Sequence, residues 1–290
     1  MNFDHFRDHY HNDLHSTIDR MVTIAMDEDL NLAAGGKDIT AELIDLETEV
    51  NASLISREHA ILCGRAWFDA CFHCLDDSIQ INWLFSDGDT VQADDVLCTI
   101  HGSARHILSA ERSAMNFLQT LSATASQTQA YVKQLARTEC RLLDTRKTLP
   151  GFRLAQKYAV LCGGGHNHRI GLFDAYLIKE NHIRACGSIA SAIKTARGNQ
   201  PETLLEIEVE SLSELEIAIA NKADVVMLDN FELDDLSKAV VMNAGQCKLE
   251  ASGNITLDTI ADVAKTGVDY ISVGAITKNI AAVDLSLQIT

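Results

Sequence analysis

Four short stretches decide the fold: LLEIEVES (204–211), DVVMLDN (224–230), CKLEASGN (247–254) and DYISVGAI (269–276). Each is an apolar run with several β-branched residues, which is typical of a buried strand. Helical sequences such as SLSELEIAIANKA lie between the runs. Strands that alternate with helices in this way predict βα units and a parallel sheet.

Polar or small residues follow these strands at a regular spacing. Glu208, Asp229, Ser252 and Gly274 stand at or just past the ends of the four runs, 21, 23 and 22 residues apart. A repeat of that length holds one strand, one helix and two turns, and around a closed sheet it gives a β/α barrel. The carboxyl ends of barrel strands converge on one mouth, so we expect these residues to lie together there.

The first half of the chain has a different rhythm. Residues 45–101 carry alternating apolar residues and Asp-Gly turns, which predict short strands, and a long helix follows over residues 109–136. An amphipathic helix is expected over residues 3–25. Two histidine pairs on it, His5/His9 and His11/His15, are spaced for metal chelation, but a solvated helical face is the favoured interpretation.

Composition excludes several classes of protein. The formal net charge of −17 argues against nucleic acid and anionic membranes as partners. No apolar run approaches the ~20 residues of a membrane span, and the polar N-terminal sequence is unlike a secretory signal. We therefore expect a cytoplasmic protein whose eight cysteines are reduced. A zinc site at Cys71-Phe72-His73-Cys74 is a weaker interpretation than buried thiols, because no second ligand pair follows.

Positive charge is concentrated in one segment of this acidic chain. Residues 141–184 contain eight Lys and Arg against three Asp and Glu. Such a cluster at a barrel mouth suits a small polyanion. Glu208 and Asp229 could then serve as counter-ions or hold Mg²⁺ bridged to phosphate. Ser252-Gly253-Asn254 is expected to open a helix, whose free N–H groups would cradle a phosphate.

Seven motifs together resemble the quinolinate phosphoribosyltransferase family. They are ERSAMNFLQTLS, DTRKTLPGFRLAQKYAV, GGGHNHRIGLFDAYLIKENH, EIEVES, VMLDNF, EASGNIT and YISVGAITK, in the family's order and within residues 20–289. The resemblance implies Mg²⁺-dependent transfer of phosphoribosyl from 5-phosphoribosyl-1-pyrophosphate to quinolinate. The expected products are nicotinate mononucleotide, pyrophosphate and CO₂, which places the enzyme in NAD biosynthesis.

The resemblance also implies an architecture. An N-terminal α/β sandwich domain would span residues 1–118, and an incomplete, seven-stranded α/β barrel would span residues 119–276. The tail, residues 277–290, is expected to pack back on the first domain. A homodimer is expected, with higher oligomers left open, and each active site would be completed by the other subunit.

The family's functional residues map onto this sequence by motif. Arg112 would reach into the partner subunit's site. The expected substrate-binding residues are Thr145, Arg146, Lys147, His168, Arg169, Lys179, Glu208, Asp229, Ser252, Gly253, Asn254 and Gly274. Lys147, Glu208 and Asp229 are the expected catalytic residues, and Glu208 and Asp229 would serve the metal directly or through substrate or water.

Three alternatives stay open on sequence alone. A paralogue of the same fold could use another acceptor, although the dense cations of DTRK, HNHR and IKEN favour a dicarboxylate. A Schiff-base aldolase could use Lys179 as its nucleophile. A non-catalytic sugar-phosphate sensor would have no need of Glu208 and Asp229.

Overall fold

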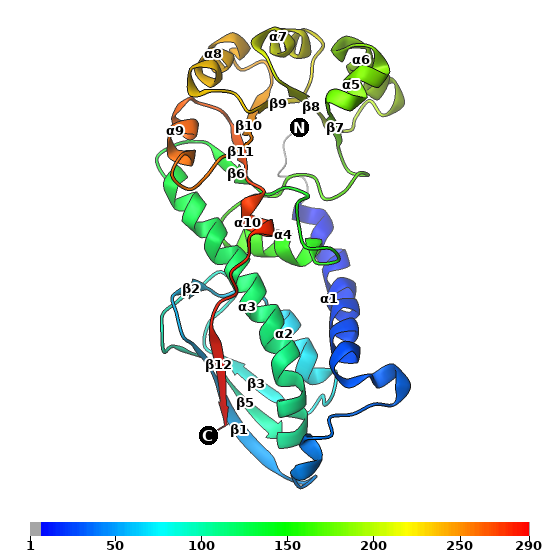
Figure 1. The fold of residues 1–290 in the computed structure, drawn as a ribbon, viewed down its shortest axis with the longest axis vertical. Coiled ribbons are helices and arrows are strands. Elements are labelled where there is room, and N and C mark those ends of the chain that lie inside the picture. The colour runs from blue at the N-terminus through cyan, green and yellow to red at the C-terminus, as the bar shows by residue number, and fades with distance from the viewer. Residues whose placement is uncertain (1–6, 290) are drawn as a thin grey trace. The chain divides into compact units, whose positions relative to one another are not determined.

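The computed structural model describes residues 7–289, with side chains from Leu14 onward. Its chain divides into two units, which are treated separately below (Figure 1). The parallel unit contains Thr128–Arg153 and Gly165–Lys278, and the antiparallel unit contains Asp8–Gln127, Leu154–Gly164 and Asn279–Thr290. The boundary suggested by the sequence, after residue 118, falls inside helix α3 (Ala104–Leu135). No helix within residues 7–289 has the length and hydropathy of a membrane span.

A four-stranded sheet forms the centre of the antiparallel unit. Its order is β12 (Leu285–Ile289), β1 (Glu49–Ser56), β5 (Val96–Ser103) and β3 (Gln80–Trp83), and every neighbouring pair is antiparallel. A separate ribbon pairs β2 (Ala60–Ile61) with β4 (Thr90–Val91). The helices of this unit are α1 (Arg7–Leu30), α2 (Arg65–His73), most of α3, and α4 (Arg153–Cys162), with 3-10 turns η2 (Leu32–Ala34) and η3 (Ala41–Leu43).

Helix α1 buries the apolar stripe expected from its spacing. Of the expected stripe, Ile18 and Met21 are buried and Leu14 and Ala25 are half-buried. The buried face also includes Val22, Met26 and Leu30, because they recur every four residues. The side chains of His5, His9 and His11 lie outside the described residues. His15 is exposed.

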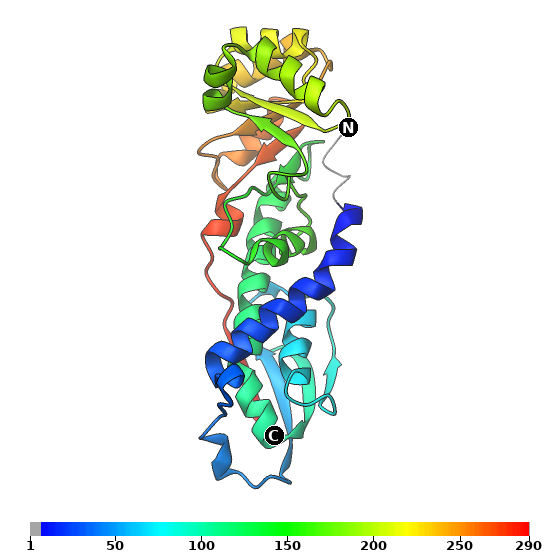
Figure 2. The same ribbon diagram turned by 90° about the vertical axis from the view of Figure 1, so that its right-hand side faces the viewer.

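Six strands form the sheet of the parallel unit, and all neighbouring pairs are parallel. Their order is β6 (Arg141–Leu143), β11 (Tyr270–Ser272), β10 (Lys248–Ser252), β9 (Val225–Asp229), β8 (Leu205–Val209) and β7 (Tyr176–Ile178). The connecting helices are α5 (Glu180–Cys186), α6 (Ile189–Asn199), α7 (Leu212–Ala220), α8 (Leu233–Asn243), α9 (Ile260–Lys265) and α10 (Ala275–Lys278). Figures 1 and 2 show α6 to α8 as a layer outside the strands β7 to β9.

The seventh expected strand is reduced to a single bridge. His166 pairs in parallel with Leu143 of β6: its N–H donates to the carbonyl of Leu142, and its carbonyl accepts from Asp144. The backbone then leaves the ladder, because the N–H of His168 donates instead to the side chain of Asp144. The mixed α/β fold, with a small N-terminal sheet and a parallel-strand α/β unit, is otherwise as predicted.

Candidate active site

The residues predicted for the mouth of the barrel stand at the carboxyl ends of its strands. Glu208 lies on β8, and Asp229 and Ser252 are the last residues of β9 and β10. Lys179 follows β7 directly, and Gly274 comes two residues after β11. Since the strands are parallel, these ends share one edge of the sheet.

An ion pair joins two of these residues across neighbouring strands. Lys179 Nζ, directly after β7, contacts Glu208 Oε2 on β8. The carboxyl of Glu208 is mostly buried, whereas the lysine side chain is about half exposed. Glu208 is therefore held in place while the ammonium group stays open to a ligand.

Asp229 lies in a less favourable environment for its negative charge. Burial, followed by the negative charge of Glu208, raises the pKa of Asp229 above its ordinary value. Asn230 Nδ2 donates to Asp229 Oδ2 at 2.8 Å, and the charges of Lys179 and Lys147 act in the opposite direction. Two carboxylates at adjacent strand ends that repel each other are a suitable place for a cation to bind.

The loop after β10 does not open a helix, and this prediction was wrong. Helix α9 begins only at Ile260. Gly253 and Asn254 both have positive φ, at 100° and 50°, and an α-helix requires negative φ. The loop instead packs closely on its neighbour: the N–H of Asn230 donates to the Ser252 carbonyl, and Asn254 Nδ2 donates to Asn230 Oδ1. Any phosphate bound here would be held by this loop and not by a helix dipole.

Gly253→Ala is expected to disturb that loop more than its backbone strain alone would. A Cβ atom at Gly253 would lie 2.2 Å from Asn230 Oδ1, so Asn230, which contacts Asp229, would have to move. We expect a loss of about 1–3 kcal/mol in the free energy of unfolding together with a fall in kcat, measured by urea unfolding and steady-state rates. Gly245→Ala is the control, because Gly245 also has positive φ but has no atom within 4 Å of the new Cβ. Equal losses in the two variants would contradict the assigned contact.

The loop after β6 carries the predicted residues Thr145, Arg146 and Lys147, and it lies against the loop after β11. Lys147 N donates to Thr145 Oγ1 at 3.0 Å, and the Lys147 carbonyl accepts from Thr277 of α10. A Cβ at Gly274 would lie 2.9 Å from Lys147 Cδ and 3.4 Å from Thr145 Oγ1. Glycine at position 274 thus lets the β6 and β11 loops approach each other.

Asp144, which the sequence did not single out, anchors the segment that carries His168 and Arg169. It is fully buried, and its two carboxylate oxygens accept from Asn167 Nδ2 at 2.6 Å and from the N–H of His168 at 2.9 Å. A buried carboxylate needs such donors, because burial without them is costly. The apolar run of β6 therefore ends in an anchoring carboxylate before the exposed cations begin.

Arg169, which follows this anchored segment, is near enough to Arg146 to be affected by its charge. Arg169 is only 7% exposed, and its Nη1 donates to the Ala175 carbonyl at 3.2 Å. Burial, and then the positive charge of Arg146, lower the pKa of Arg169. Among the described residues, the buried Nε atoms of Arg146 and Arg169 have no hydrogen-bond partner. Both guanidinium groups thus keep a buried donor that no described residue satisfies.

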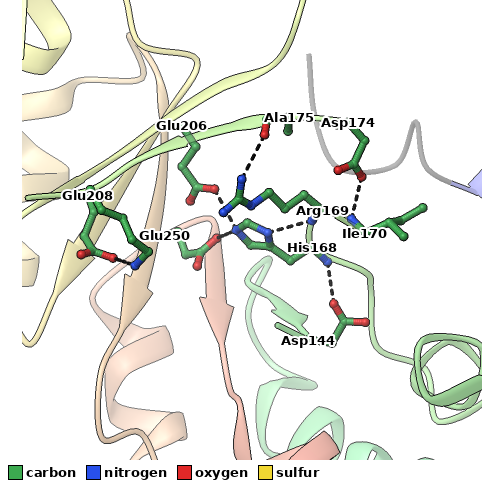
Figure 3. A network of polar contacts seen from close by, with 10 residues as sticks. Asp144, His168, Arg169, Ile170, Asp174, Ala175, Glu206, Glu208 and Glu250 are labelled. Carbon is green, nitrogen blue, oxygen red and sulfur yellow. Dashed lines mark hydrogen bonds and ion pairs between the residues drawn. The ribbon is translucent and has the colours of Figure 1, made fainter. Parts of the chain in front are cut away.

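A buried cluster that the sequence analysis missed lies one layer below the strand-end residues of the barrel mouth (Figure 3). His168 Nε2 lies 2.7 Å from Glu206 Oε2 and 3.6 Å from Glu250 Oε2. Glu206 and Glu250 come two residues before Glu208 and Ser252 on their strands, so they share the inward face one layer deeper. A carboxylate within an otherwise apolar strand was the signal in the sequence for this layer.

The remaining candidates lie in the antiparallel unit. Arg112 is exposed on α3. Cys71 is buried, which raises the pKa of its thiol to about 12, and Cys74 is exposed. Neither thiol belongs to a group of three potential metal ligands within residues 14–289. A buried core thiol therefore explains Cys71 better than a zinc site.

One group in this unit does bring three potential metal ligands close together: Cys63, Asp87 and Cys162. Asp87 is already engaged, since it accepts from Tyr158 Oη at 2.8 Å and from the N–H groups of Gly64 and Arg65. Burial also raises the pKa of the Cys63 thiol well above its ordinary value. The cluster is explained by the hydrogen bonds that Asp87 makes at the start of α2 and by the burial of Cys63, without a metal.

Family models match nearly the whole chain. The C-terminal domain of quinolinate phosphoribosyl transferase matches residues 124–288, and the N-terminal domain of the same family matches residues 38–122.

Curated relatives and solved structures agree with these matches. A probable carboxylating nicotinate-nucleotide pyrophosphorylase of Bacillus subtilis is 39% identical over 257 residues, which cover 88% of this chain and 89% of that protein. The carboxylating enzyme of Mycobacterium leprae is 38% identical, covering 91% and 94%. The solved nicotinate-nucleotide pyrophosphorylase of Francisella tularensis superposes with a TM-score of 0.91 at 52% identity, covering 95% of this chain and 96% of that one.

A more distant likeness shows the fold alone. Human nicotinic acid phosphoribosyltransferase superposes with a TM-score of 0.59 at 14% identity, covering 83% of this chain and 70% of that one. With both domain models matched in order and relatives aligned over most of their own length, the chain belongs to the quinolinate phosphoribosyltransferase family.

Proposed function

We propose that this protein transfers the phosphoribosyl group of 5-phosphoribosyl-1-pyrophosphate to quinolinate, releasing pyrophosphate and CO₂ and leaving nicotinate mononucleotide. The observation that carries the proposal is the pair of guanidinium groups, Arg146 and Arg169, with buried Nε donors that lack a hydrogen-bond partner among the described residues. Planar guanidinium groups bind carboxylates bidentately, and quinolinate presents two carboxylates on one ring.

The carboxylates of Glu208 and Asp229 suit the sugar donor. Departure of pyrophosphate leaves positive charge on the ribose, and Glu208 and Asp229 would stabilise such a charge. Lys179 and Lys147 can neutralise phosphate oxygens as point charges. The loops holding Ser252–Asn254 and Gly274 would receive the 5-phosphate.

Decarboxylation follows from the acceptor once it is ribosylated. Its ring nitrogen is then cationic and stabilises the electron pair left at C2 when CO₂ departs, and a proton from solvent then forms the C2–H bond. The protein needs only to hold the 2-carboxylate in position, which is the task given to the two arginines.

Mg²⁺ is proposed as the metal of the reaction, and the donor set fits it. Hard oxygen ligands, with Asp229 and Glu208 at adjacent strand ends, match a cation that takes one or two carboxylates plus substrate oxygens. Because Lys179 already contacts Glu208, Asp229 is the better direct ligand, and Glu208 would act through water or substrate. When bound, the metal would stabilise the charge that develops on the leaving pyrophosphate.

A homodimer is also proposed, with Arg112 entering the partner subunit's site. Its position on α3, outside the βα repeat, gives it no evident task in its own barrel. The cytoplasmic location expected from the polar N-terminal sequence stays a prediction.

The Schiff-base aldolase is disfavoured by the contacts of Lys179. A catalytic amine must be free to attack a carbonyl, and Lys179 Nζ is already engaged in an ion pair with Glu208. Whether the protein is instead a paralogue of the same fold is decided by which acceptor it uses.

Quinolinate should be used far better than nicotinate. An acceptor without the 2-carboxylate leaves a buried cation unpaired, a penalty of about 2–5 kcal/mol, which corresponds to a roughly thirtyfold to several-thousandfold loss in kcat/KM. The measurement is CO₂ or pyrophosphate release with each acceptor. Arg169→Gln should remove most of this preference, whereas Arg184→Gln, which changes an exposed arginine paired with Glu180, should keep it. Equal use of the two acceptors by the unmodified enzyme would overturn the proposal.

A further inference from the structure

We propose that Glu206 and Glu250 are positioning residues: together they hold His168 as a neutral imidazole with its proton on Nε2, and so fix the backbone that presents Arg169 to the acceptor. The proposal rests on the proposed function for its kinetic readout. It gives His168 a different task from the direct substrate contact that the family resemblance implies.

The first step is the tautomer of His168. The backbone N–H of Arg169 donates to His168 Nδ1 at 2.7 Å, so Nδ1 must present a lone pair. A neutral imidazole carries one N–H donor and one acceptor. The proton therefore sits on Nε2.

The second step is the partner of that proton. Nε2 lies 2.7 Å from Glu206 Oε2, which makes this carboxyl oxygen the nearest acceptor for the proton, although the two groups are out of line for a well-aligned hydrogen bond. Glu250 Oε2 is at 3.6 Å on the other side of the same ring nitrogen. Figure 3 shows the imidazole pointing at both carboxylates from the loop that also contacts Asp144.

The same tautomer decides against a metal at this cluster. One atom each from His168, Glu206 and Glu250 lie within 4.8 Å of one another, which is close enough for a shared cation. A ring nitrogen must be unprotonated to bind a metal. Since Nδ1 is used by Arg169 and Nε2 carries the proton, His168 has no free lone pair to offer.

Burial of two carboxyl groups lowers the stability of the folded protein, so the pair is best explained by a role in holding His168. Glu206 and Glu250 are 1% and 0% exposed, and a buried carboxyl group lowers stability unless it makes compensating interactions. Burial raises the pKa of both groups above the ordinary range for Glu. The groups that face them are His168, Arg169, Lys179, Glu208 and Ser272.

The geometric consequence reaches Arg169. Asp144 holds the N–H of His168 from one side, and the imidazole, held by Glu206, holds the N–H of Arg169 from the other. Two successive backbone groups are thereby fixed, and the Arg169 side chain extends from them to the Ala175 carbonyl. Loss of the acceptor at position 206 should let the ring turn and Arg169 shift.

The test compares two replacements at one position. Glu206→Gln keeps an oxygen acceptor, and Glu206→Leu removes it at similar volume. We expect Glu206→Leu to raise the KM for quinolinate by roughly 10- to 100-fold with a much smaller change in the KM for 5-phosphoribosyl-1-pyrophosphate. Glu206→Gln should stay within about threefold of the unmodified enzyme. Glu210→Leu, at an exposed position past the end of β8, is the matched control and should change neither constant.

A second measurement is independent of activity. Nitrogen-15 spectra of histidine-labelled enzyme at neutral pH report the tautomer of each ring, and the His168 signals are identified by their loss in His168→Gln. We expect the Nε2–H tautomer in the unmodified enzyme and in Glu206→Gln. A Nδ1–H tautomer, an imidazolium ion, or an unchanged quinolinate KM in a folded Glu206→Leu would overturn the proposal.

These outcomes separate this inference from the proposed function. If quinolinate is not a substrate at all, the proposed function fails while the spectra still decide the tautomer. If Glu206→Leu does not fold, the spectra of the unmodified enzyme and of Glu206→Gln decide the proposal by themselves.

Discussion

Asp229→Asn and Glu208→Gln should each lower kcat at saturating substrates by roughly 10²–10³-fold, with less than a tenfold change in the KM for quinolinate. Both replacements keep size and hydrogen-bonding capacity but remove the negative charge proposed to stabilise the ribose as pyrophosphate leaves. Under the proposed function the acceptor is held by Arg146 and Arg169 and not by these carboxylates, so its binding should be affected little. Initial rates over a matrix of both substrate concentrations give the constants.

The control for this pair is Glu210→Gln, which removes a carboxylate just beyond the same strand at an exposed position. It should leave kcat unchanged. Near-normal turnover in Asp229→Asn would show that its carboxylate stabilises neither the transition state nor a metal.

Mixing two inactive variants should restore activity if Arg112 acts across a subunit interface. Under the proposed pairing, Arg112→Ala and Lys147→Ala each damage both sites of a homodimer. In a mixed dimer both lesions fall in one site and leave the other intact. Random reassociation makes about half the dimers mixed, each with one good site, so activity should return to roughly a quarter of the unmodified value.

The measurement is activity after the two variants are dissociated, mixed and reassociated, with subunit exchange followed by a mass tag on one variant. Each variant carried alone through the same treatment is the control and should stay inactive. Confirmed exchange without recovered activity would mean that Arg112 has no role in the partner's site.

The sequence predicted the part of the fold that depends on local pattern. The strands β8 to β11 and their helices were predicted because apolar runs, helical sequences and a regular spacing all agreed. The grouping of Glu208, Asp229, Ser252 and Gly274 at one edge followed from the rule that parallel strands share one carboxyl edge.

What the sequence did not predict depends on contacts between distant segments. The buried layer of Glu206 and Glu250 is invisible without knowing which strand face points inward and where His168 lies. The loop at Gly253 was expected to open a helix, but Gly253 and Asn254 have positive φ and pack on Asn230. The seventh strand was expected by resemblance, whereas Asp144 draws the backbone away after one bridge.

The pairing of β12 with β1 has a consequence for how the chain is made. Ala52 to Ser56 pair with Leu285 to Ile289, so this edge of the four-stranded sheet closes only after the whole parallel unit has been synthesised. Until then a nascent chain on the ribosome carries β1 with one side unpaired, and open strand edges promote aggregation. Chaperone demand during translation should therefore last until the final strand emerges, and chains released early should be the ones that aggregate or are degraded.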